Sequence, residues 1–530
     1  MCHSCRLASA LFLILAACSP VSPIAPARAV TVTELAPDAR LSASCKLSAN
    51  GKTIPVESWR DIHLASFVAD ENEKLTLSVN AARPINSHAI HPQSFGLKGT
   101  VNGAGDTLTF SLNQSARQAS PAYLLIRING TDELVVLIDP PSPPSAKNAA
   151  NVCDVTAQPY GADATGERLA TRPIQAAVDA CSAAGGGIVR IPKGVFRVQT
   201  VVLKSDVTLY LDAGTVLRGS NRLTDFTGEF APKGSTIRKL PPVVQAQNFK
   251  NVALLGHGCI DAAQGDFIDA TGQPFQVQEK GPYRRKAVHL EDGEGFRAED
   301  LTIRDAGGWC VFLDKVNEVS LSRLKVLTPL WTWSDGIDVC GSNIKIEKCF
   351  VYSGDDSFCT KAMHANYPIS NIHISDCVVY SLCGALKVGM QGLSEQKDIH
   401  FNNIDAIRAG KGLVVEHRPH WTKETDAAAM HDIHFTNIRI DEVGRYKDAR
   451  RFRGPIYIQS YMPAPIYDVY ITNVTVANSG PEKSVIKGHS VENPASNIFV
   501  KNLIIGGKPV TSLKDSDFAT RNIKDIKLQN

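Results

Sequence analysis

From Asp206 onward, apolar and polar residues alternate in short segments that recur at a nearly regular distance. Each segment begins with a polar residue, Asn or Asp, and then carries apolar residues at alternate positions. The successive starts lie 26, 28, 27, 34, 36 and 29 residues apart. Alternation with a period of two inside a repeat of this length is typical of stacked coils of parallel β-strands, and not of a sandwich or a β/α barrel. The clearest segments begin at Asn317, Asn343, Asn371, Asp398, Asp432, Asp468 and Asn497.

The repeat predicts an all-β solenoid, a parallel β-helix, over residues 151–530. Each coil would bury its alternating apolar residues against the coils above and below, which gives the array one continuous core. The recurrent Asn-Ile and Asp-Cys steps inside the segments indicate a bend between two strands of one coil. The longer gaps, such as residues 417–432, are loops that can build a cleft.

Residues 31–139 differ from the repeat and predict a small N-terminal β-sandwich. Short alternating segments with frequent turns fill this region. Tyr123–Ile128 and Leu134–Ile138 flank an Asn-Gly turn, which indicates a hairpin. Residues 140–150 begin with a Pro-rich run that predicts a stiff linker. The N-terminal unit carries no readable chemistry, and we expect deletion of residues 31–145 to spare the catalytic coils.

One convincing helix is predicted, ahead of the strand array. Thr171 is the expected N-cap, and Pro173 fits the first turn. Gly185–Gly187 ends the helical pattern. Such an amphipathic helix can plug the open end of a solenoid. Its apolar face comprises Ile174, Ala177, Val178 and Cys181.

Residues 1–29 are predicted to be a targeting segment rather than part of the fold. An apolar stretch follows Arg6, and two cleavage patterns compete. Ala27–Ala29 is an A-x-A signal-peptide site, whereas Leu15–Cys18 resembles a bacterial lipobox in which Cys18 would carry a lipid. Both patterns predict an exported chain that is secreted, periplasmic or lipid-anchored to a bacterial membrane. No later apolar run is long enough to span a bilayer.

Charge and cysteine content narrow the class of partner. The chain has a formal net charge of +3 and a pI near 8.1, which argues against a nucleic-acid binder. Of its 13 cysteines, three lie in residues 1–29, and the other ten form no CxxC pair of the zinc-site type. We therefore expect buried cysteines along the stack, no metal, no cofactor and a monomer. The sequence leaves the disulfide pairing open.

Two acidic motifs lie about one coil apart, at Ser334–Asp338 and Gly354–Asp356. Parallel strands stack at roughly 4.8 Å, so Asp335 and Asp355, 20 residues apart, can face one groove. Crowded carboxylates cannot all ionise easily, so at least one should hold a proton at neutral pH. An acid and a base in one site are what hydrolysis of a glycosidic bond requires. The alternative is a set of turn residues, because Asp-Gly and Gly-Asp are common in turns.

On these motifs, residues 151–507 resemble glycoside hydrolase family 28, the polygalacturonase family, and its β-helical relatives in the pectin-lyase-like superfamily. Ser334–Asp338 is similar to the family's Asn-Thr-Asp-Gly-x-Asp motif, and Gly354–Lys361 to its Asp-Asp motif with a following lysine. Gly256–Asp261 is similar to an upstream Gly-x-Gly-x-Ile-Asp-Gly element, although Ala262 replaces the last glycine. The resemblance implies a right-handed β-helix. A β-domain ahead of such a helix also resembles the dextranase-type family.

The resemblance implies catalytic roles as well. Asp355 would be the general acid that protonates the leaving glycosidic oxygen, and Asp335 and Asp356 would hold and deprotonate the attacking water. Asp338 would anchor the turn. Because the family inverts the anomeric carbon, the implied protein is an exported, inverting glycosidase of a plant or microbial polysaccharide.

Two departures from the family pattern concern the substrate. Cys383–Ala385 stands where polygalacturonases carry Gly-His-Gly, and Val414–Glu416 where they carry the Arg-Ile-Lys that binds the sugar carboxylate. We expect Glu416 to repel a galacturonate carboxylate, and hence a substrate other than ordinary polygalacturonate. Aromatic faces, cations and polar groups near the acidic coils would contact the sugar. The residues predicted to bind substrate are Trp331, Trp333, Lys361, Lys387, Glu416 and His417.

Three alternatives stay open at this point. The first is a pectin-type polygalacturonase or rhamnogalacturonase. The second is a polysaccharide lyase, which would abstract a proton beside a uronate carboxylate with the help of calcium or a basic residue. The third is a carbohydrate-binding β-helix protein without catalytic activity. The sequence does not identify the sugar, the linkage, or endo against exo action.

Overall fold

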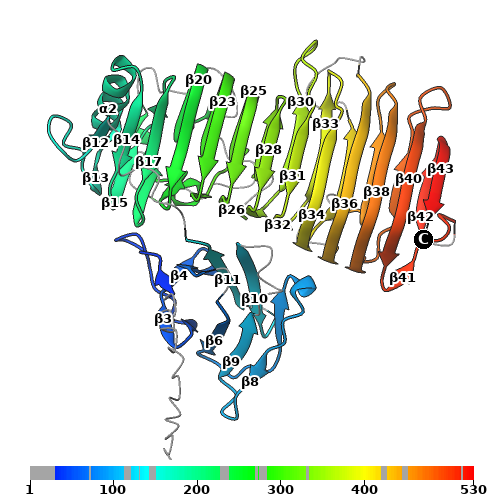
Figure 1. Cartoon of the computed structure of the whole chain (residues 1–530), viewed down its shortest axis with the longest axis horizontal. Coiled ribbons are helices and arrows are strands. Elements are labelled where there is room, and N and C mark those ends of the chain that lie inside the picture. Colours follow the sequence, from blue (N-terminus) through cyan, green and yellow to red (C-terminus); the bar gives the residue numbers. More distant parts are fainter. Residues whose placement is uncertain are drawn as a thin grey trace, which may run out of the picture.

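The chain folds into a small β-sandwich and a long right-handed parallel β-helix that lie against each other (Figure 1). The targeting segment and both of its cleavage patterns lie outside the residues that the structure describes. Within those residues, no helix is both long and apolar enough to cross a membrane. The computed structural model describes residues 30–70, 73–112, 121–130, 132–141, 151–226, 238–268, 273, 283–329, 333–418, 427–444, 452–514 and 517–529.

The N-terminal unit is the predicted sandwich of two sheets. One sheet contains β1 (Thr31–Val32), β4 (Val56–Trp59), β5 (Ile62–Val68), β7 (His88–His91), β10 (Ala122–Ile128) and β11 (Asp132–Asp139). The other contains β2 (Cys45–Ala49), β3 (Lys52–Ile54), β6 (Leu75–Ala81), β8 (Thr100–Val101) and β9 (Thr107–Leu112). β10 and β11 pair antiparallel, which confirms the predicted hairpin. Leu47 and Leu77 of one sheet share a core with Phe67 and Leu124 of the other.

Helix α2 (Thr171–Ala183) closes the N-terminal end of the β-helix (Figure 1). Its buried residues include all four that the apolar pattern predicted. The predicted N-cap is wrong, because Ala170 is the N-cap and Thr171 is already helical. The Thr171 hydroxyl instead accepts a hydrogen bond from the backbone N–H of Gln199 at 2.9 Å. It therefore joins the helix to the first coils rather than satisfying the helix's own N–H groups.

The β-helix is one continuous sheet of 30 strands within the described part of the chain, and nearly all of its pairings are parallel. The first strands are β12 (Val152–Asp154), β13 (Thr165–Leu169), β14 (Gly187–Ile191), β15 (Gly194–Val198), β16 (Val201–Val202), β17 (Val207–Leu211), β18 (Thr215–Gly219), β20 (Val244–Gly256), β21 (Cys259–Asp261), β23 (Val288–Glu299) and β24 (Thr302–Arg304). The central strands are β25 (Val311–Ser322), β26 (Lys325–Thr328), β27 (Ile337–Cys340), β28 (Ile344–Glu347), β29 (Phe350–Ser353), β30 (Phe358–Ala362), β31 (Ile372–Ser375), β32 (Val378–Ser381), β33 (Gly384–Gly392), β34 (Ile399–Arg408) and β35 (Lys411–His417). The last strands are β36 (Met430–Glu442), β37 (Ile456–Ser460), β38 (Ile466–Asn478), β39 (Ser484–Lys487), β40 (Ala495–Ile505), β41 (Lys508–Pro509), β42 (Phe518–Arg521) and β43 (Ile523–Gln529). A separate pair, β19 (Arg238–Lys239) and β22 (Tyr283–Arg284), and the 3-10 turns η1 (Gln93–Phe95), η2 (Leu223–Asp225) and η4 (Gln264–Asp266) complete the elements.

The core of the β-helix repeats from coil to coil, as the alternation predicted. Equivalent inward-facing residues occupy matching positions in the parallel register, and all of them are buried. Because each layer covers the next, the coils share one apolar core. One such row comprises Ile344, Ile372, Ile399, Ile433, Val469 and Ile498.

The bends of the coils carry Asn and Asp in the left-handed backbone region. Asn437, Asn473 and Asn502 have φ values of 56°, 55° and 52°. Short polar side chains tolerate this conformation because they can form local hydrogen bonds. The side-chain amide of Asn473 donates to Asn437 Oδ1 at 3.0 Å, and that of Asn502 donates to Asn473 Oδ1 at 2.9 Å. These stacked amides confirm the bends that the Asn-Ile steps predicted.

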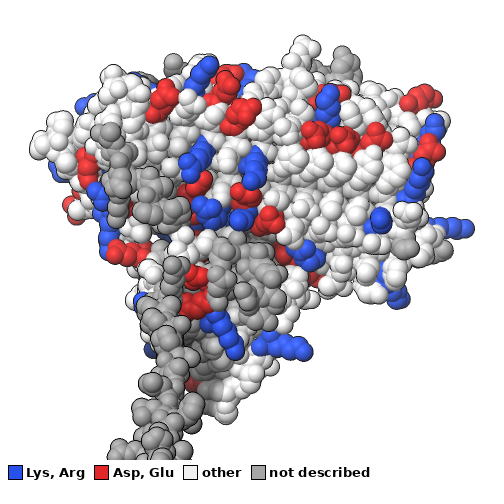
Figure 2. Space-filling model, viewed as in Figure 1, with Lys and Arg blue, Asp and Glu red and all other residues white. Residues whose placement is uncertain are grey.

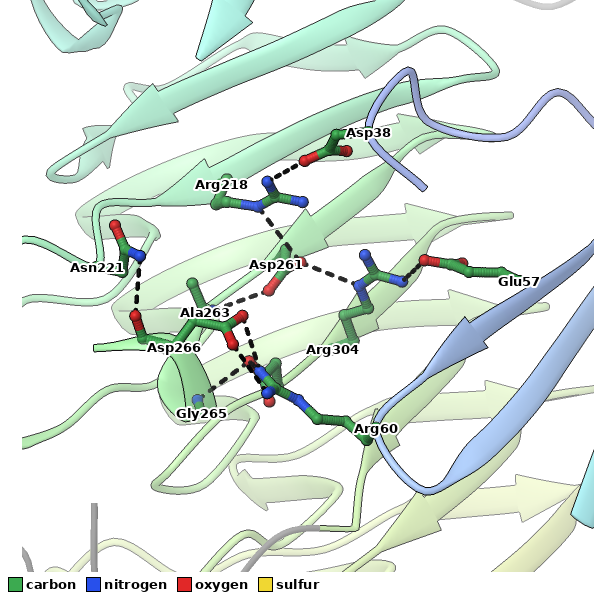
Figure 3. Close-up of polar contacts among 11 residues, drawn as sticks. Asp38, Glu57, Arg60, Arg218, Asn221, Asp261, Ala263, Gly265, Asp266 and Arg304 are labelled. Atoms are coloured by element: carbon green, nitrogen blue, oxygen red, sulfur yellow. Dashed lines mark hydrogen bonds and ion pairs between the residues drawn. The ribbon is translucent and has the colours of Figure 1, made fainter. Parts of the chain in front are cut away.

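Charged side chains join the sandwich to the outside of the β-helix (Figure 3). Arg304 lies between Glu57 of the sandwich, at 3.0 Å, and Asp261 of its own β-helix, at 3.1 Å. Arg60 of the sandwich pairs with Asp266 at 3.0 Å. Figure 2 shows positive and negative side chains interspersed on the visible face, consistent with the balanced net charge. Two further pairs across the same contact are Arg60 with Asp305 and Arg218 with Asp38.

An apolar contact lies beside these ion pairs. Trp59, Leu64 and Leu125 of the sandwich belong to one buried cluster with Phe350 and Tyr380 of the β-helix. The expectation that the coils tolerate loss of the sandwich is therefore not supported, because this loss would expose their half of the cluster.

A buried ion pair also crosses between the two units. Lys325 of β26 donates to Asp139 of the sandwich at 2.8 Å, and both side chains are buried. The hydroxyl of Tyr123 donates to the other carboxylate oxygen of Asp139 at 3.0 Å. Each unit therefore depends on the other to neutralise its own buried charge.

Candidate active site

The two acidic motifs lie on neighbouring coils, as their spacing predicted. Asp335 precedes β27, Asp355 and Asp356 precede β30, and these strands pair in parallel. The backbone N–H of Gly336 donates to the carbonyl of Asp356 at 2.8 Å. A Cβ atom at Gly336 would lie 2.6 Å from the carbonyl oxygen of Ser357, so a side chain is excluded there. The Asp-Gly step thus allows the two acidic turns to lie directly against each other.

The three predicted catalytic aspartates line a single cleft. The cleft combines carboxylates, cations and aromatic rings from β30, β33, β35 and β37 and from segments between the strands. Its lining comprises Trp309, Trp333, Asp335, Asp355, Asp356, Lys361, Cys383, Lys387, Gln391, Lys411, Glu416, Arg418, Arg453 and Tyr457.

Asp356 is held as an anion. Its carboxylate accepts hydrogen bonds from the backbone N–H of Gly384 at 2.9 Å and from Lys387 Nζ at 2.6 Å. Burial acts to raise the pKa of Asp356, but Lys387, Lys411 and Lys361 outweigh burial and hold this pKa far below its ordinary value. The Gly-His-Gly histidine of the family pattern is absent, and in this chain a lysine contacts the carboxylate.

The pKa of Asp335 is shifted in the opposite direction, upward. Its carboxylate accepts a hydrogen bond from Lys361 Nζ at 3.0 Å, and its side chain is buried. Burial is the largest influence and raises the pKa of Asp335 to about 7, with the charges of Asp355 and Asp356 acting in the same direction. Asp338 lies behind it, where burial and the charge of Asp335 raise the pKa of Asp338 well above its ordinary value. The crowded carboxylates therefore retain protons near neutral pH, as the sequence predicted.

Asp355 is the most exposed of the three catalytic candidates, at 9% against 3% for each of the other two. Its Oδ2 atom accepts a hydrogen bond from the backbone N–H of Trp333 at 2.7 Å. Trp333 has a φ of 82°, an unusual conformation for a bulky residue. Backbone strain of this kind is concentrated at functional sites, and here it directs an N–H group at Asp355.

The predicted substrate-binding residues fall into different positions. Trp333 lines the cleft, with the Arg284 guanidinium 5.1 Å from its ring centroid, whereas Trp331 lies outside the described residues. Lys361 and Lys387 line the cleft, but both are buried and paired with the aspartates. In this geometry, Lys361 and Lys387 control the ionisation of the carboxylates of Asp335 and Asp356.

Two predictions need correction. Glu416 is not an isolated carboxylate, because Lys411 Nζ lies 3.6 Å and Arg418 Nε 3.3 Å from its oxygens. Burial acts to raise the pKa of Glu416, but Lys411, Lys387 and Arg418 hold this pKa below its ordinary value.

His417 does not line the cleft: it is fully buried, and burial lowers its pKa to about 4. It follows Glu416 on a strand, so its side chain points to the opposite face.

Residues 181–521, more than half of the chain, match the family model described as glycosyl hydrolases family 28. The chain belongs to glycosyl hydrolases family 28. The match contains both acidic motifs and every residue that lines the cleft. The family 28 assignment makes this protein a glycosidase of the polygalacturonase and rhamnogalacturonase type.

Named relatives agree with the family 28 assignment at low identity. The chain is 24% identical to the exo-poly-alpha-D-galacturonosidase of Dickeya chrysanthemi over 428 residues, which cover 69% of each chain. It is 22% identical to rhamnogalacturonase A of Aspergillus aculeatus over 268 residues, which cover 50% of this chain and 54% of that one.

Solved structures show the same fold. The family 28 exopolygalacturonase of Yersinia enterocolitica aligns with a TM-score of 0.55 and 17% identity, over 86% of this chain and 97% of that one. Dex49A from Penicillium minioluteum aligns with a TM-score of 0.59 and 12% identity, over 94% of this chain and 96% of that one. The second alignment is long enough to include the N-terminal sandwich.

Sequence reasoning missed part of this family 28 cleft. It assigned no role to Lys411, Arg418, Arg453 or Tyr457, which all line the cleft. Tyr457 aligns with Val414 in the parallel register of β35 and β37. Its position in the repeat, one coil after Val414, is the sequence signal that could have placed it beside the cleft. Arg418 and Arg453 lie outside the strands and follow no periodic pattern.

Proposed function

We propose that this protein is an exported family 28 hydrolase that cleaves a glycosidic bond in a uronate-containing polysaccharide, with inversion at the anomeric carbon. The observation that carries the proposal is the convergence of three carboxylates in one cleft, two of which have pKa values shifted in opposite directions. Asp356 is held ionised, while burial raises the pKa of Asp335 to about 7. The site thus has both a proton to donate and a carboxylate to receive one.

In the proposed mechanism, the proton that Asp335 holds below about pH 7 is shared with the neighbouring carboxylates of the cleft. The productive form has this proton on Asp355, the most exposed of the three. Asp355 gives it to the glycosidic oxygen as the bond to the anomeric carbon breaks. Asp335 and Asp356 hold the water, whose oxygen bonds to that carbon from the other face, and Asp335 takes the water's proton because its pKa makes it the better base.

The cations of the cleft support an acidic sugar as substrate. Five cationic side chains line the cleft against four carboxylates, and Lys411 and Arg418 neutralise Glu416. The reason for excluding polygalacturonate, repulsion by Glu416, therefore no longer applies. Arg453 has no carboxylate partner among the described residues, and it lies beside Tyr457 with the guanidinium 6.0 Å from the ring centroid. We propose that Arg453 receives the uronate carboxylate.

The Arg453→Met substitution tests this assignment. We expect KM for uronate-containing polysaccharides to rise roughly tenfold or more, because a charge-assisted hydrogen bond is lost. Arg172→Met, at an exposed position of α2 far from the cleft, is the matched control and should leave KM unchanged. Equal KM values for the Arg453 variant and the wild type would contradict the assignment.

The pH profile tests the shared proton. As pH rises through about 7, the proton that Asp335 holds is lost from the cleft, so kcat/KM should fall about tenfold per pH unit. Lys361 acts to lower the pKa of Asp335, so Lys361→Met should move the falling limb to higher pH. Lys345→Met, on an exposed side chain of β28, is the control and should not move it. A limb that begins more than two units from pH 7 would overturn the proposed protonation.

A panel of glycans decides the reaction class. Polygalacturonate, rhamnogalacturonan, dextran and neutral glycans are incubated with the protein, and the products are separated and sized. NMR of the first-formed anomer reports inversion or retention, and an ultraviolet-absorbing unsaturated product would indicate a lyase instead. Fractionation of producing cells tests export. Cleavage confined to neutral glycans would refute the uronate proposal without touching the hydrolase assignment.

A further inference from the structure

Three potential metal ligands from three successive coils converge outside the catalytic cleft. Asp314 is on β25, Cys340 ends β27, and His364 follows β30. A carboxylate oxygen, the sulfur and an imidazole nitrogen of these residues lie within 4.8 Å of one another. None of the three lines the catalytic cleft. The proposed hydrolysis does not use them.

We propose that Asp314, Cys340 and His364 bind a divalent transition metal ion of the zinc class, with solvent as the fourth ligand. Sulfur, imidazole and carboxylate donors together favour zinc-like ions, because calcium and magnesium prefer oxygen donors alone. Three protein ligands and one open position form a common tetrahedral arrangement for zinc.

The distances agree with this proposal. Zinc binds sulfur at about 2.3 Å and nitrogen or oxygen at about 2.0–2.2 Å, so two donors on one tetrahedral ion lie about 3.3–3.7 Å apart. The donors here lie within 4.8 Å of one another, so the most distant ones would need to approach by up to about 1 Å. His364 Nε2 and Asp314 Oδ1 are 2.6 Å apart in a hydrogen bond, which a bound ion would replace with two coordinate bonds.

The fold fixes two ligands and leaves access for an ion. Asp314 and Cys340 are direct neighbours in the parallel register of β25 and β27, so the stack itself sets their separation. Cys340 is fully buried, whereas the His364 side chain is 36% exposed and connects the site with solvent. Lys315, the nearest lysine in sequence, pairs with Asp292 rather than with Asp314.

The ion would tie three coils together beside Lys361, three residues before His364. It would therefore add stability to the wall of the active site.

Cobalt(II) titration of the full-length protein tests the proposal, because cobalt bound to a thiolate gives a sulfur-to-metal charge-transfer absorption in the near ultraviolet. We expect one cobalt ion per chain with this band, displacement of the ion by zinc, and a higher melting temperature with zinc. The band should disappear in Cys340→Ser and weaken in His364→Gln. Absence of the band in the wild type would overturn the proposal.

Two variants exclude other sites. Cys383 lies near Asp355 and Asp356 in a second group of potential ligands, so Cys383→Ser is the matched cysteine control and should keep the band. His373, Asp398 and His400 form a third group on the surface, and His373→Gln should likewise keep it. A band that survives Cys340→Ser but is lost in Cys383→Ser would overturn the assignment. If Cys340→Ser fails to fold, Asp314→Asn and His364→Gln report on the same site.

Discussion

Replacing Asp355 with Asn is expected to lower kcat on the polysaccharide by roughly 10³-fold and to leave the fold intact. The amide has the size of the carboxyl group and can still accept the hydrogen bond from the backbone of Trp333. It cannot donate a proton to the leaving oxygen at a useful rate. Circular dichroism and the melting temperature should match those of the wild type, so the loss measures chemistry rather than folding.

The leaving group distinguishes the roles of the aspartates. In an aryl glycoside of an acidic phenol, the phenolate leaves without being protonated. The Asp355→Asn variant should therefore recover most of its activity on such a substrate. Asp335→Asn should not recover, because the attacking water still needs a base. Asp356→Asn is a poorer test, since it leaves Lys387 buried without its carboxylate and should cost about 3–5 kcal/mol of stability. Polysaccharide turnover by Asp355→Asn within threefold of the wild type would remove Asp355 from the mechanism.

Deleting the sandwich, residues 30–141, is expected to yield an insoluble or strongly destabilised β-helix. Burial of one large apolar side chain contributes about 1.5–3 kcal/mol, whereas a typical protein is stable by only about 5–15 kcal/mol. Exposing the face that the sandwich covers would therefore remove most of the free energy of unfolding of the β-helix. It would also leave an aggregation-prone surface. The residues so exposed are Leu327, Phe350, Tyr352, Val378, Tyr380 and Ile407.

A pair of point variants tests the same contact without deletion. Asp139→Ala leaves Lys325 buried without its carboxylate partner, so the free energy of unfolding should fall by about 3–5 kcal/mol in urea titrations. The double variant Asp139→Leu with Lys325→Met removes both charges and should recover most of this loss. Arg168→Ala, which removes a side chain that is 81% exposed beside Asp163, is the control and should cost less than about 1 kcal/mol. A soluble, fully active truncated β-helix would show that the sandwich is dispensable.

The parts of the fold that the sequence predicted are those governed by local rules. Asn437 and Asn473 recur at the coil bends because few other residues accept the left-handed backbone conformation there. Asp335 and Asp355 could be placed together because the length of one coil converts a spacing of 20 residues into adjacency. The helix was found from its apolar face, but its first residue was not, because Thr171 bonds to a distant backbone group rather than to its own helix.

The parts that escaped prediction depend on contacts between distant segments. The charge of Glu416 could be read from the sequence, but its neutralisation by Arg418 depends on how the chain leaves β35. The pairing of Lys325 with Asp139 joins residues that are 186 positions apart and belong to different units. The ligand group around Cys340 has no CxxC-like spacing, since its members come from three coils. Periodicity locates a residue on its coil, and it does not tell which side chains from other segments approach it.

The stacked amides at the coil bends determine which changes in chain length evolution can accept in this protein. Adding one residue between Asn437 and Asn473 within the strands would shift the apolar row by one position and turn it toward solvent. Adding a complete coil would preserve the amide row, and lengthening a loop outside the strands would not disturb it. Diversification of such a protein is therefore expected to proceed by whole-coil duplication and by loop growth around the cleft, which changes the accessible glycans while the scaffold stays constant.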